Sequence, residues 1–154
     1  MKKFVSILFA LVIFNSVTTN AQGMSSYLEH HWYGWYTETS TTFVGDQYTM
    51  YYEMYDVVYD NTYNTFTATM YGSIKIDDVN YATTWKINGK MDGDYNVQLN
   101  YSYKLSADEL PQGLYWIYDN LSGKLYTDSN HSGEYLISGY KPGTDGKFEL
   151  STYK

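Results

Sequence analysis

Apolar and polar side chains alternate almost without interruption through residues 66–105, and this pattern limits the fold more than any other feature of the sequence. A period of two over so many residues is typical of β-strands with one dry face and one wet face. Residues 77–78 and 92–94 interrupt the alternation, and both stretches are too short to be crossover connections. The sequence therefore predicts three consecutive antiparallel strands, each with one face turned toward a core.

Further alternating segments on both sides of this block extend the prediction to an all-β protein. The turns between them are rich in glycine, and no segment has helical periodicity of any length. Ser106 and Glu109 have the spacing of a capping box that Pro111 ends, which predicts one helical turn at residues 106–109. The other predicted strands span residues 30–36, 48–59, 114–120, 124–129, 134–140 and 147–153.

Four glycines indicate how such a meander closes. A sheet of eight or nine strands has two unpaired edge strands unless it closes on itself. Gly34, Gly72, Gly89 and Gly139 lie in mid-strand, in phase with the apolar faces, where glycine permits sharp coiling. We therefore expect an antiparallel up-and-down β-barrel of eight or nine strands with one short helical turn.

The first 21 residues have the pattern of a secretory signal peptide. Lys2 and Lys3 precede an apolar run over residues 4–14, and Ala21 is a small residue at a suitable cleavage position. The apolar run is too short to span a bilayer, and no later run is longer. We therefore expect residues 1–21 to be removed and residues 22–154 to form a single secreted or periplasmic domain without a membrane span.

The composition narrows the classes of partner. The chain has no cysteine, so packing rather than disulfides must stabilise it. It has no arginine and a formal net charge of −7, which disfavours nucleic acids and anionic membrane surfaces as partners. Its 20 tyrosines suit both β-strands and binding surfaces.

The histidines and carboxylates do not have the spacing of a catalytic or metal site. His30 and His31 are neighbours on a predicted strand and point to opposite faces. Residues 128–132 include serine, histidine and aspartate but form a polar turn without a nucleophile elbow. Residues 92–97 imitate the start of a calcium loop but lack its glycine, and they are explained by a hairpin turn. We therefore predict no enzyme activity, no metal site and no cofactor.

Four features of the sequence occur together in one order. The secretory signal is followed by a first strand that reads Trp-Tyr-Gly-Trp-Tyr over residues 32–36, then by a long loop over residues 37–47, and then by a meander of this length. This layout resembles the calycin group, which comprises lipocalin-like and avidin-like barrels. Lipocalins carry Gly-x-Trp in the first strand, where this chain has tyrosine as the third residue (Tyr36), and their closing arginine has no counterpart here. The resemblance implies a small-molecule pocket at one barrel mouth and carries over no binding residue.

Aromatic residues in the apolar phase of the strands form the candidate ligand site. A core that needed only bulk would use phenylalanine and leucine, because each buried, unpaired hydroxyl costs about 1–3 kcal/mol. Either these hydroxyls reach the barrel ends and pair with one another, or some line a cavity and contact a ligand. The predicted ligand-binding residues are Trp32, Tyr36, Tyr52, Trp85, Tyr101, Tyr103, Trp116 and Tyr118.

Three functions fit these observations. The first is a binding protein that holds a small, partly apolar ligand or a sugar at an aromatic-lined barrel mouth. The second is a surface interaction protein, of the inhibitor or adhesion type, that binds a protein partner through outward aromatic residues. The third is a small outer-membrane barrel whose apolar faces meet lipid, which the short last strands disfavour. The predicted outward aromatic residues are Tyr33, Trp35, Tyr51, Tyr55, Tyr59 and Tyr71.

Overall fold

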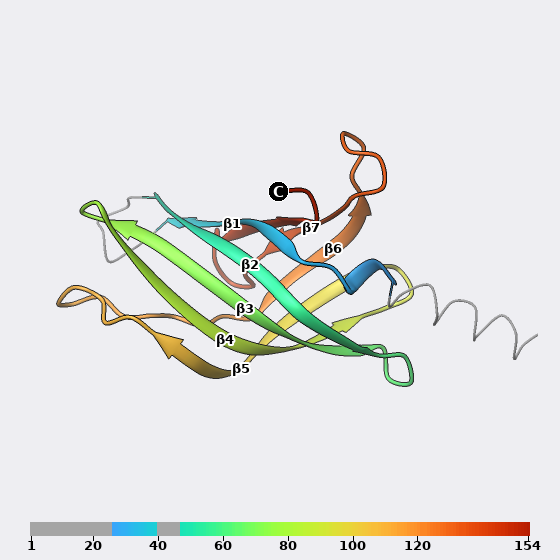
Figure 1. Cartoon of the computed structure of the whole chain (residues 1–154), viewed down its shortest axis with the longest axis horizontal. Coiled ribbons are helices and arrows are strands. Elements are labelled where there is room, and N and C mark those ends of the chain that lie inside the picture. The colour runs from blue at the N-terminus through green and yellow to red at the C-terminus, as the bar shows by residue number, and fades with distance from the viewer. Residues whose placement is uncertain (1–25, 40–46) are drawn as a thin grey trace, which may run out of the picture.

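Eight strands, each paired with its neighbour along the chain, close into an antiparallel barrel (Figure 1). The structure, a computed structural model, describes residues 26–39 and 47–154. The strands in these ranges are β1 (Trp32–Thr39), β2 (Gln47–Asp60), β3 (Thr65–Ile76), β4 (Val79–Met91), β5 (Asn96–Ala107), β6 (Leu121–Thr127), β7 (Tyr135–Tyr140) and β8 (Lys147–Ser151). This confirms the predicted all-β up-and-down barrel. The predicted signal peptide, residues 1–21, and most of the predicted long loop, residues 40–46, lie outside the described residues.

The barrel closes where β1 pairs with β8, at Gly34. Gly34 lies opposite Leu150, and a Cβ atom at this position would overlap the carbonyl oxygen of Glu149. Glycine has no Cβ, so it lets the two backbones approach this closely. The β1–β8 pairing at Gly34, called the seam below, therefore closes the sheet into a barrel.

The inward faces of the strands form one hydrophobic core. The alternation holds in β3 and β4, where Phe66, Met70 and Ile87 are buried and the inward Gly89 leaves room for the ring of Phe66. Burying a large apolar side chain contributes about 1.5–3 kcal/mol, so this face supplies much of the stability. The largest fully buried apolar side chains are Trp32, Leu28, Met54, Met70, Met91, Leu99, Ile137, Leu150 and Val97.

A β-bulge in β2 reverses the inward phase at its far end. Asp56 has a φ of 51°, and the register with β3 shifts between Tyr55 and Val58. The extra residue turns Val57 inward and leaves Val58 67% exposed. The prediction that Val58 faces the core is therefore wrong, and Tyr59, predicted to face outward, packs against the core instead.

Two irregularities in β5 have the same effect. The register with β4 shifts so that Tyr101 lies opposite Ile87 while Tyr103 lies opposite Lys86. Neighbouring positions on β4 face opposite sides of the sheet, so Tyr103 points outward and is 55% exposed. The prediction of an inward Tyr103 is wrong, as is the inward phase of Leu105, which is also exposed.

The stretch after β5 forms neither the predicted helical turn nor the predicted strand. The backbone N–H of Asp108 donates to the carbonyl of Ala82 (2.9 Å), and its carboxylate accepts the N–H of Ala82 (2.8 Å). These bonds prolong the β4–β5 pairing through the region expected to be helical, and residues 114–120 contain no strand. Within the described ranges, a short helical piece lies at residues 26–28. No helix of the described residues is long and apolar enough to cross a membrane.

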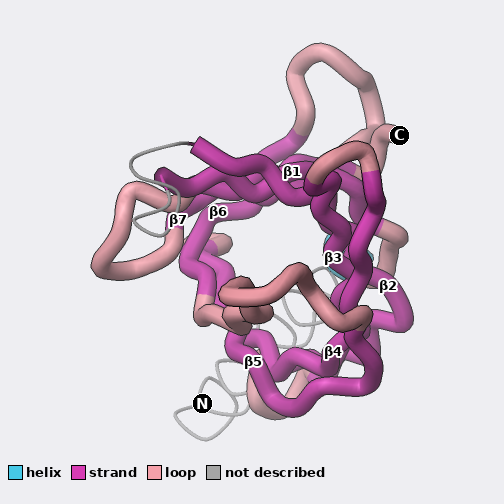
Figure 2. The backbone as a smooth tube through the Cα atoms, turned by 90° about the vertical axis from the view of Figure 1, so that its left-hand side faces the viewer, coloured by secondary structure: helices cyan, strands magenta, loops and turns pink. Residues whose placement is uncertain are grey.

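The connection between β5 and β6, residues 108–120, runs across one end of the barrel (Figure 2). β6 pairs with β5 only from Asn96 to Leu99, so among described residues the rest of β5 lacks a strand partner on that side. The N–H of Tyr101 instead donates to Oδ1 of Asn120 (3.2 Å). We call this end of the barrel, where β1 ends and β2 begins, the mouth.

Candidate functional site

A buried carboxylate lies at the mouth. Glu38, near the end of β1, is only 9% exposed. Its Oε2 accepts hydrogen bonds from the hydroxyls of Tyr36 (2.5 Å) and Tyr48 (2.8 Å), and Nζ of Lys141 donates to both carboxylate oxygens (3.0 and 3.1 Å). A buried charge is costly unless it is paired and hydrogen-bonded, and these bonds provide for both needs.

Lys141 connects three segments that lie far apart in the sequence. Its Nζ is 2.8 Å from Oδ2 of Asp119, in addition to its contacts with Glu38. Glu38 belongs to β1, Lys141 follows β7 directly, and Asp119 lies in the β5–β6 connection. The two ion pairs therefore hold the connection against the barrel wall. Tyr36, Glu38, Tyr48, Asp119 and Lys141 are called the mouth cluster below.

The mouth cluster keeps Glu38 ionised. Burial opposes its ionisation, but the hydrogen bonds from Tyr36, Tyr48 and Lys141 outweigh burial and lower the pKa of this carboxyl below its ordinary value. Burial, followed by the hydrogen bond to Glu38, raises the pKa of the Tyr36 and Tyr48 hydroxyls, which remain donors. Burial opposes the charge of Lys141 as well, but its bonds to Asp119 and Glu38 raise its pKa.

Acidification should destabilise the protein through Glu38. The pKa of Glu38 is lower in the folded protein than its ordinary value of 4.5, so the unfolded chain takes up the proton first. Its contribution is therefore fully present above about pH 4.5 and is lost as the pH falls through the folded pKa. We expect Glu38→Gln to flatten the fall in the free energy of unfolding below pH 4.5, measured by urea denaturation. Glu109→Gln, at an exposed position, is the matched control, and an unchanged slope in Glu38→Gln would contradict the assignment.

Below the mouth cluster, a series of aromatic rings runs through the barrel interior. The ring of Tyr36 stacks on Tyr52 (centroids 5.7 Å apart), Tyr52 meets Trp85 edge-on (5.6 Å), Trp85 contacts Tyr118 (5.5 Å), and Tyr118 stacks on Tyr101 (4.9 Å). Five of the eight predicted site residues are thus brought together in one continuous series. Their rings pack against one another within the barrel.

An apolar recess opens at the mouth beside the mouth cluster. It has a volume of about 100 Å³ and lies between β2, β3 and the β5–β6 connection. Tyr48 lines the recess and also donates to Glu38, so the recess borders the buried charge. A second, more open hollow of about 380 Å³ shares part of the wall formed by the connection. The apolar side chains around the recess include Met50, Ile74, Ile76, Leu110, Leu114 and Trp116.

The remaining predicted site residues have three different positions. Trp116 lines both hollows, and its Nε1 donates to the carbonyl of Asp108 (2.8 Å), which fixes the ring against the start of the connection. Trp32 is fully buried near the opposite end of the barrel, where its Nε1 donates to the carbonyl of Leu28 (3.1 Å). Tyr103 lies outside the barrel. The structure therefore leaves Trp116 as the predicted residue with the best access to a ligand.

His31 and His131 lie away from the mouth and contact neighbouring side chains. Nε2 of His31 is 2.8 Å from Glu53, and the His31 ring stacks on Tyr33. His131 lies 2.9 Å from Asp128 within a turn. Within residues 26–39 and 47–154, no three histidine, cysteine, aspartate or glutamate side chains lie close enough together to hold a metal ion.

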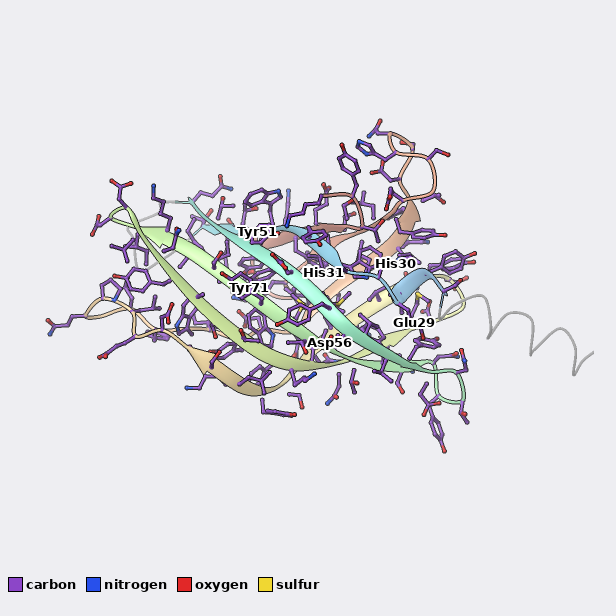
Figure 3. All side chains as sticks on the ribbon, viewed as in Figure 1. Glu29, His30, His31, Tyr51, Asp56 and Tyr71 are labelled. Carbon is purple, nitrogen blue, oxygen red and sulfur yellow. The ribbon has the colours of Figure 1, made fainter. Side chains whose placement is uncertain are left out.

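The predicted outward aromatic surface is only partly present. Figure 3 shows Tyr51 and Tyr71 on the outer face of β2 and β3. The ring of Tyr51 meets Trp35 edge-on (5.4 Å) and its hydroxyl donates to Glu53, so neighbouring side chains cover much of it. Of the six predicted outward rings, only Trp35 is more than half exposed.

The comparisons with known proteins do not add a family to this description. No protein-family model, curated protein sequence or solved structure matches the chain. The geometry of the mouth therefore carries the functional argument by itself.

Proposed function

We propose that this protein binds a small, partly apolar ligand at the mouth of the barrel, in the recess beneath the β5–β6 connection. The observation that carries the proposal is the combination of apolar walls from β2, β3 and the connection with the hydroxyl of Tyr48, which leads to the mouth cluster. Pockets with mostly apolar walls and a few placed polar groups are typical of small-molecule sites.

The size of the recess limits the ligand. An apolar cavity of about 150 Å³ can hold benzene, so a recess of about 100 Å³ accepts a short aliphatic group as it stands. A larger ligand requires the connection to move outward. Among described residues, no strand pairs with residues 110–117 of the connection, and Tyr115 and Ile117 are exposed on it. An outward movement of this part would therefore break no strand ladder, while Asp119 stays paired with Lys141. A sugar, whose rim of hydroxyls needs several hydrogen-bond partners, suits these mostly apolar walls less well.

The mouth cluster supports a binding function rather than catalysis. Both oxygens of Glu38 are occupied by Lys141, and two tyrosines add further bonds to one of them. A general base needs a lone pair directed at a substrate proton, whereas this carboxylate is saturated. We therefore propose a non-catalytic, cofactor-free binding protein of calycin-like layout, exported as a secreted or periplasmic domain.

The distribution of polar side chains disfavours the outer-membrane alternative. A membrane barrel has an apolar outer band and a polar interior. Here the interior positions carry residues such as Met54, Met70 and Leu150, while Lys90 and Glu149 project outward. A barrel in an aqueous compartment is consistent with this arrangement.

Replacing Trp116 with leucine should weaken ligand binding several-fold. Aromatic contacts are worth about 0.5–1.5 kcal/mol beyond burial, and leucine keeps most of the packing volume. The test is native mass spectrometry of the protein with linear C4–C10 alcohols and carboxylic acids, indole and monosaccharides, followed by titration of each hit.

The matched control is Trp35→Leu, which removes a tryptophan from the outer face and should leave the affinity for the alcohols, carboxylic acids and indole unchanged. Equal affinities for wild type and Trp116→Leu, or no binding of any probe, would refute the mouth as the ligand site.

A further inference from the structure

The outer face of β5, β6, β7, β8 and β1 carries an open groove of about 1020 Å³. Its lining is largely polar, unlike the apolar lining of the recess at the mouth. Figure 2 shows β6, β7 and β1 in the same wall of the barrel. The strand register arranges the outward side chains of this wall in two rows. One row contains Gln98, Ser122, Tyr140, Lys147 and Thr37, and the next contains Asn96, Lys124, Ser138, Glu149 and Trp35. With neighbouring strands about 4.8 Å apart, each row spans about 19 Å.

A pair of glycines forms part of the floor of this groove. Gly123 lies opposite Gly139, and both line the groove. A Cβ atom on Gly123 would lie 2.8 Å from Cζ of Phe148, and one on Gly139 would lie 2.8 Å from Cε1 of the same ring. Because side chains are absent on the inner side at both positions, the two strands lie directly on Phe148. The hollow is therefore built into the packing of β6 and β7.

Three exposed aromatic rings border the groove. Trp35 is 56% exposed, Tyr140 56% and Tyr126 47%. Trp35 also lines a neighbouring hollow of about 280 Å³, and its edge-on contact with Tyr51 holds the ring in place. Such rings offer apolar faces that water covers poorly, together with polar atoms at their rims.

The polar lining of the groove is balanced in charge. Lys124 and Lys147 are matched by Asp92 and Glu149, although the whole chain has a net charge of −7. Between described residues, the structure has no side-chain hydrogen bond or ion pair to Gln98, Lys147 or Glu149. Donors and acceptors are thus available on both sides of the exposed rings.

We propose that this groove binds a neutral, linear oligosaccharide, a function beyond the one assigned to the mouth. A sugar ring has an apolar face of C–H groups, which packs on aromatic rings, and a rim of hydroxyls, which bond to amide, hydroxyl and charged side chains. The groove presents both kinds of contact over a length that suits a chain of several sugars. Its balanced charge favours a neutral chain over an acidic one.

The strand pairing argues against a peptide in the same groove. A peptide that adds to a sheet needs an open strand edge, and a helical peptide needs an apolar groove. β7, β8 and β1, and β6 up to Lys124, are paired on both sides within the closed barrel. The part of β5 beyond Leu99 that lacks a β6 partner does not line the groove, so the groove offers no such edge along its rows. The alternating polar and aromatic lining also lacks the continuous apolar stripe that a helix would cover.

The test is binding of the protein to an array of neutral linear hexasaccharides (cello-, xylo-, malto-, manno- and chitohexaose), with affinities from isothermal titration calorimetry. We expect binding to at least one, with Trp35→Ala and Tyr140→Ala each weakening it about tenfold, the loss of a good aromatic contact. Tyr63→Ala removes an even more exposed ring from the turn after β2, outside the groove, and should bind as wild type. Trp116→Leu should also bind as wild type, which separates this site from the mouth.

Circular dichroism and the thermal unfolding midpoint verify that each variant is folded. Gln98→Ala provides a second probe of the groove that removes no ring and should also weaken binding. The proposal is overturned if no hexasaccharide binds, if Trp35→Ala and Tyr140→Ala bind as tightly as wild type, or if the loss appears only in Trp116→Leu.

Discussion

Replacing Gly34 with alanine should prevent the barrel from closing. The new Cβ would overlap the carbonyl oxygen of Glu149, which belongs to the backbone of β8 and cannot rotate away as a side chain could. Overpacking of a core by a side chain typically costs about 1–3 kcal/mol. Against a rigid backbone we expect a loss of about 3 kcal/mol or more in the free energy of unfolding, or a protein that does not fold. Urea denaturation followed by tryptophan fluorescence measures the loss.

Gly93→Ala is the matched control for this prediction. Gly93 lies in the turn between β4 and β5, and a Cβ there would have no neighbour within 4 Å. Alanine at such a position changes stability by at most about 1 kcal/mol, through the unfolded chain. Equal stabilities for Gly34→Ala and Gly93→Ala would show that the β1–β8 seam is not held as described.

Replacing Lys141 with methionine should destabilise the mouth strongly. Met keeps the length of the side chain but leaves the carboxylates of Glu38 and Asp119 without their shared cation. Removing one partner of a buried ion pair costs about 3–5 kcal/mol, and partial exposure of Asp119 places the expected loss near the lower figure. The loss should shrink as the pH falls below 4.5, because protonation of Glu38 removes one of the two unpaired charges.

An exposed ion pair on the same protein provides the comparison. Lys75 lies 2.7 Å from Asp78, but both side chains are largely in water. Lys75→Met should therefore change the free energy of unfolding by less than about 1 kcal/mol. A double variant, Lys141→Met with Glu38→Gln, should recover part of the loss, since it removes a buried charge together with its partner. Similar losses for Lys75→Met and Lys141→Met would contradict the role of burial at the mouth.

The turns and the long strands could be predicted because they depend on local chemistry. Asp77 and Asp78 both adopt positive φ (49° and 64°) and form the tight turn between β3 and β4 that the sequence indicates. The bulge at Asp56 could not be predicted, because a single extra residue changes the phase without changing the composition. Residues 114–120 also alternate, with Tyr115 and Ile117 exposed, yet they pair with no strand among described residues. Alternation of apolar and polar residues predicts an extended segment with two unlike faces, but it does not predict which strand that segment pairs with.

The aromatic part of the site could be predicted, and the ionic part could not. Tyr36, Tyr52, Trp85 and Tyr101 share the inward phase of their strands, and they come together with Tyr118 from the β5–β6 connection. The pairing of Glu38 with Lys141 joins positions 103 residues apart, in segments that only barrel closure makes neighbours. One feature of the sequence nevertheless indicated the buried carboxylate of Glu38.

That feature is the phase of β1. The inward series of Trp32, Gly34 and Tyr36 continues to Glu38, which places a carboxylate on a dry face. An acidic residue in an apolar phase indicates a buried partner of opposite charge, but the predicted first strand ends at residue 36, before Glu38.

The position of the seam at Gly34 also sets an order of assembly. Hairpins from β2 to β5 join segments close together in the sequence, and such local contacts form early. The seam joins the two ends of the described chain, so its loop-closure entropy delays it until the other strands are in place. During that interval β1 and β8 present open edges to any neighbouring molecule. At high concentration, two refolding chains would complete each other's barrels, and a strand-swapped dimer is the misfolded species that this topology favours.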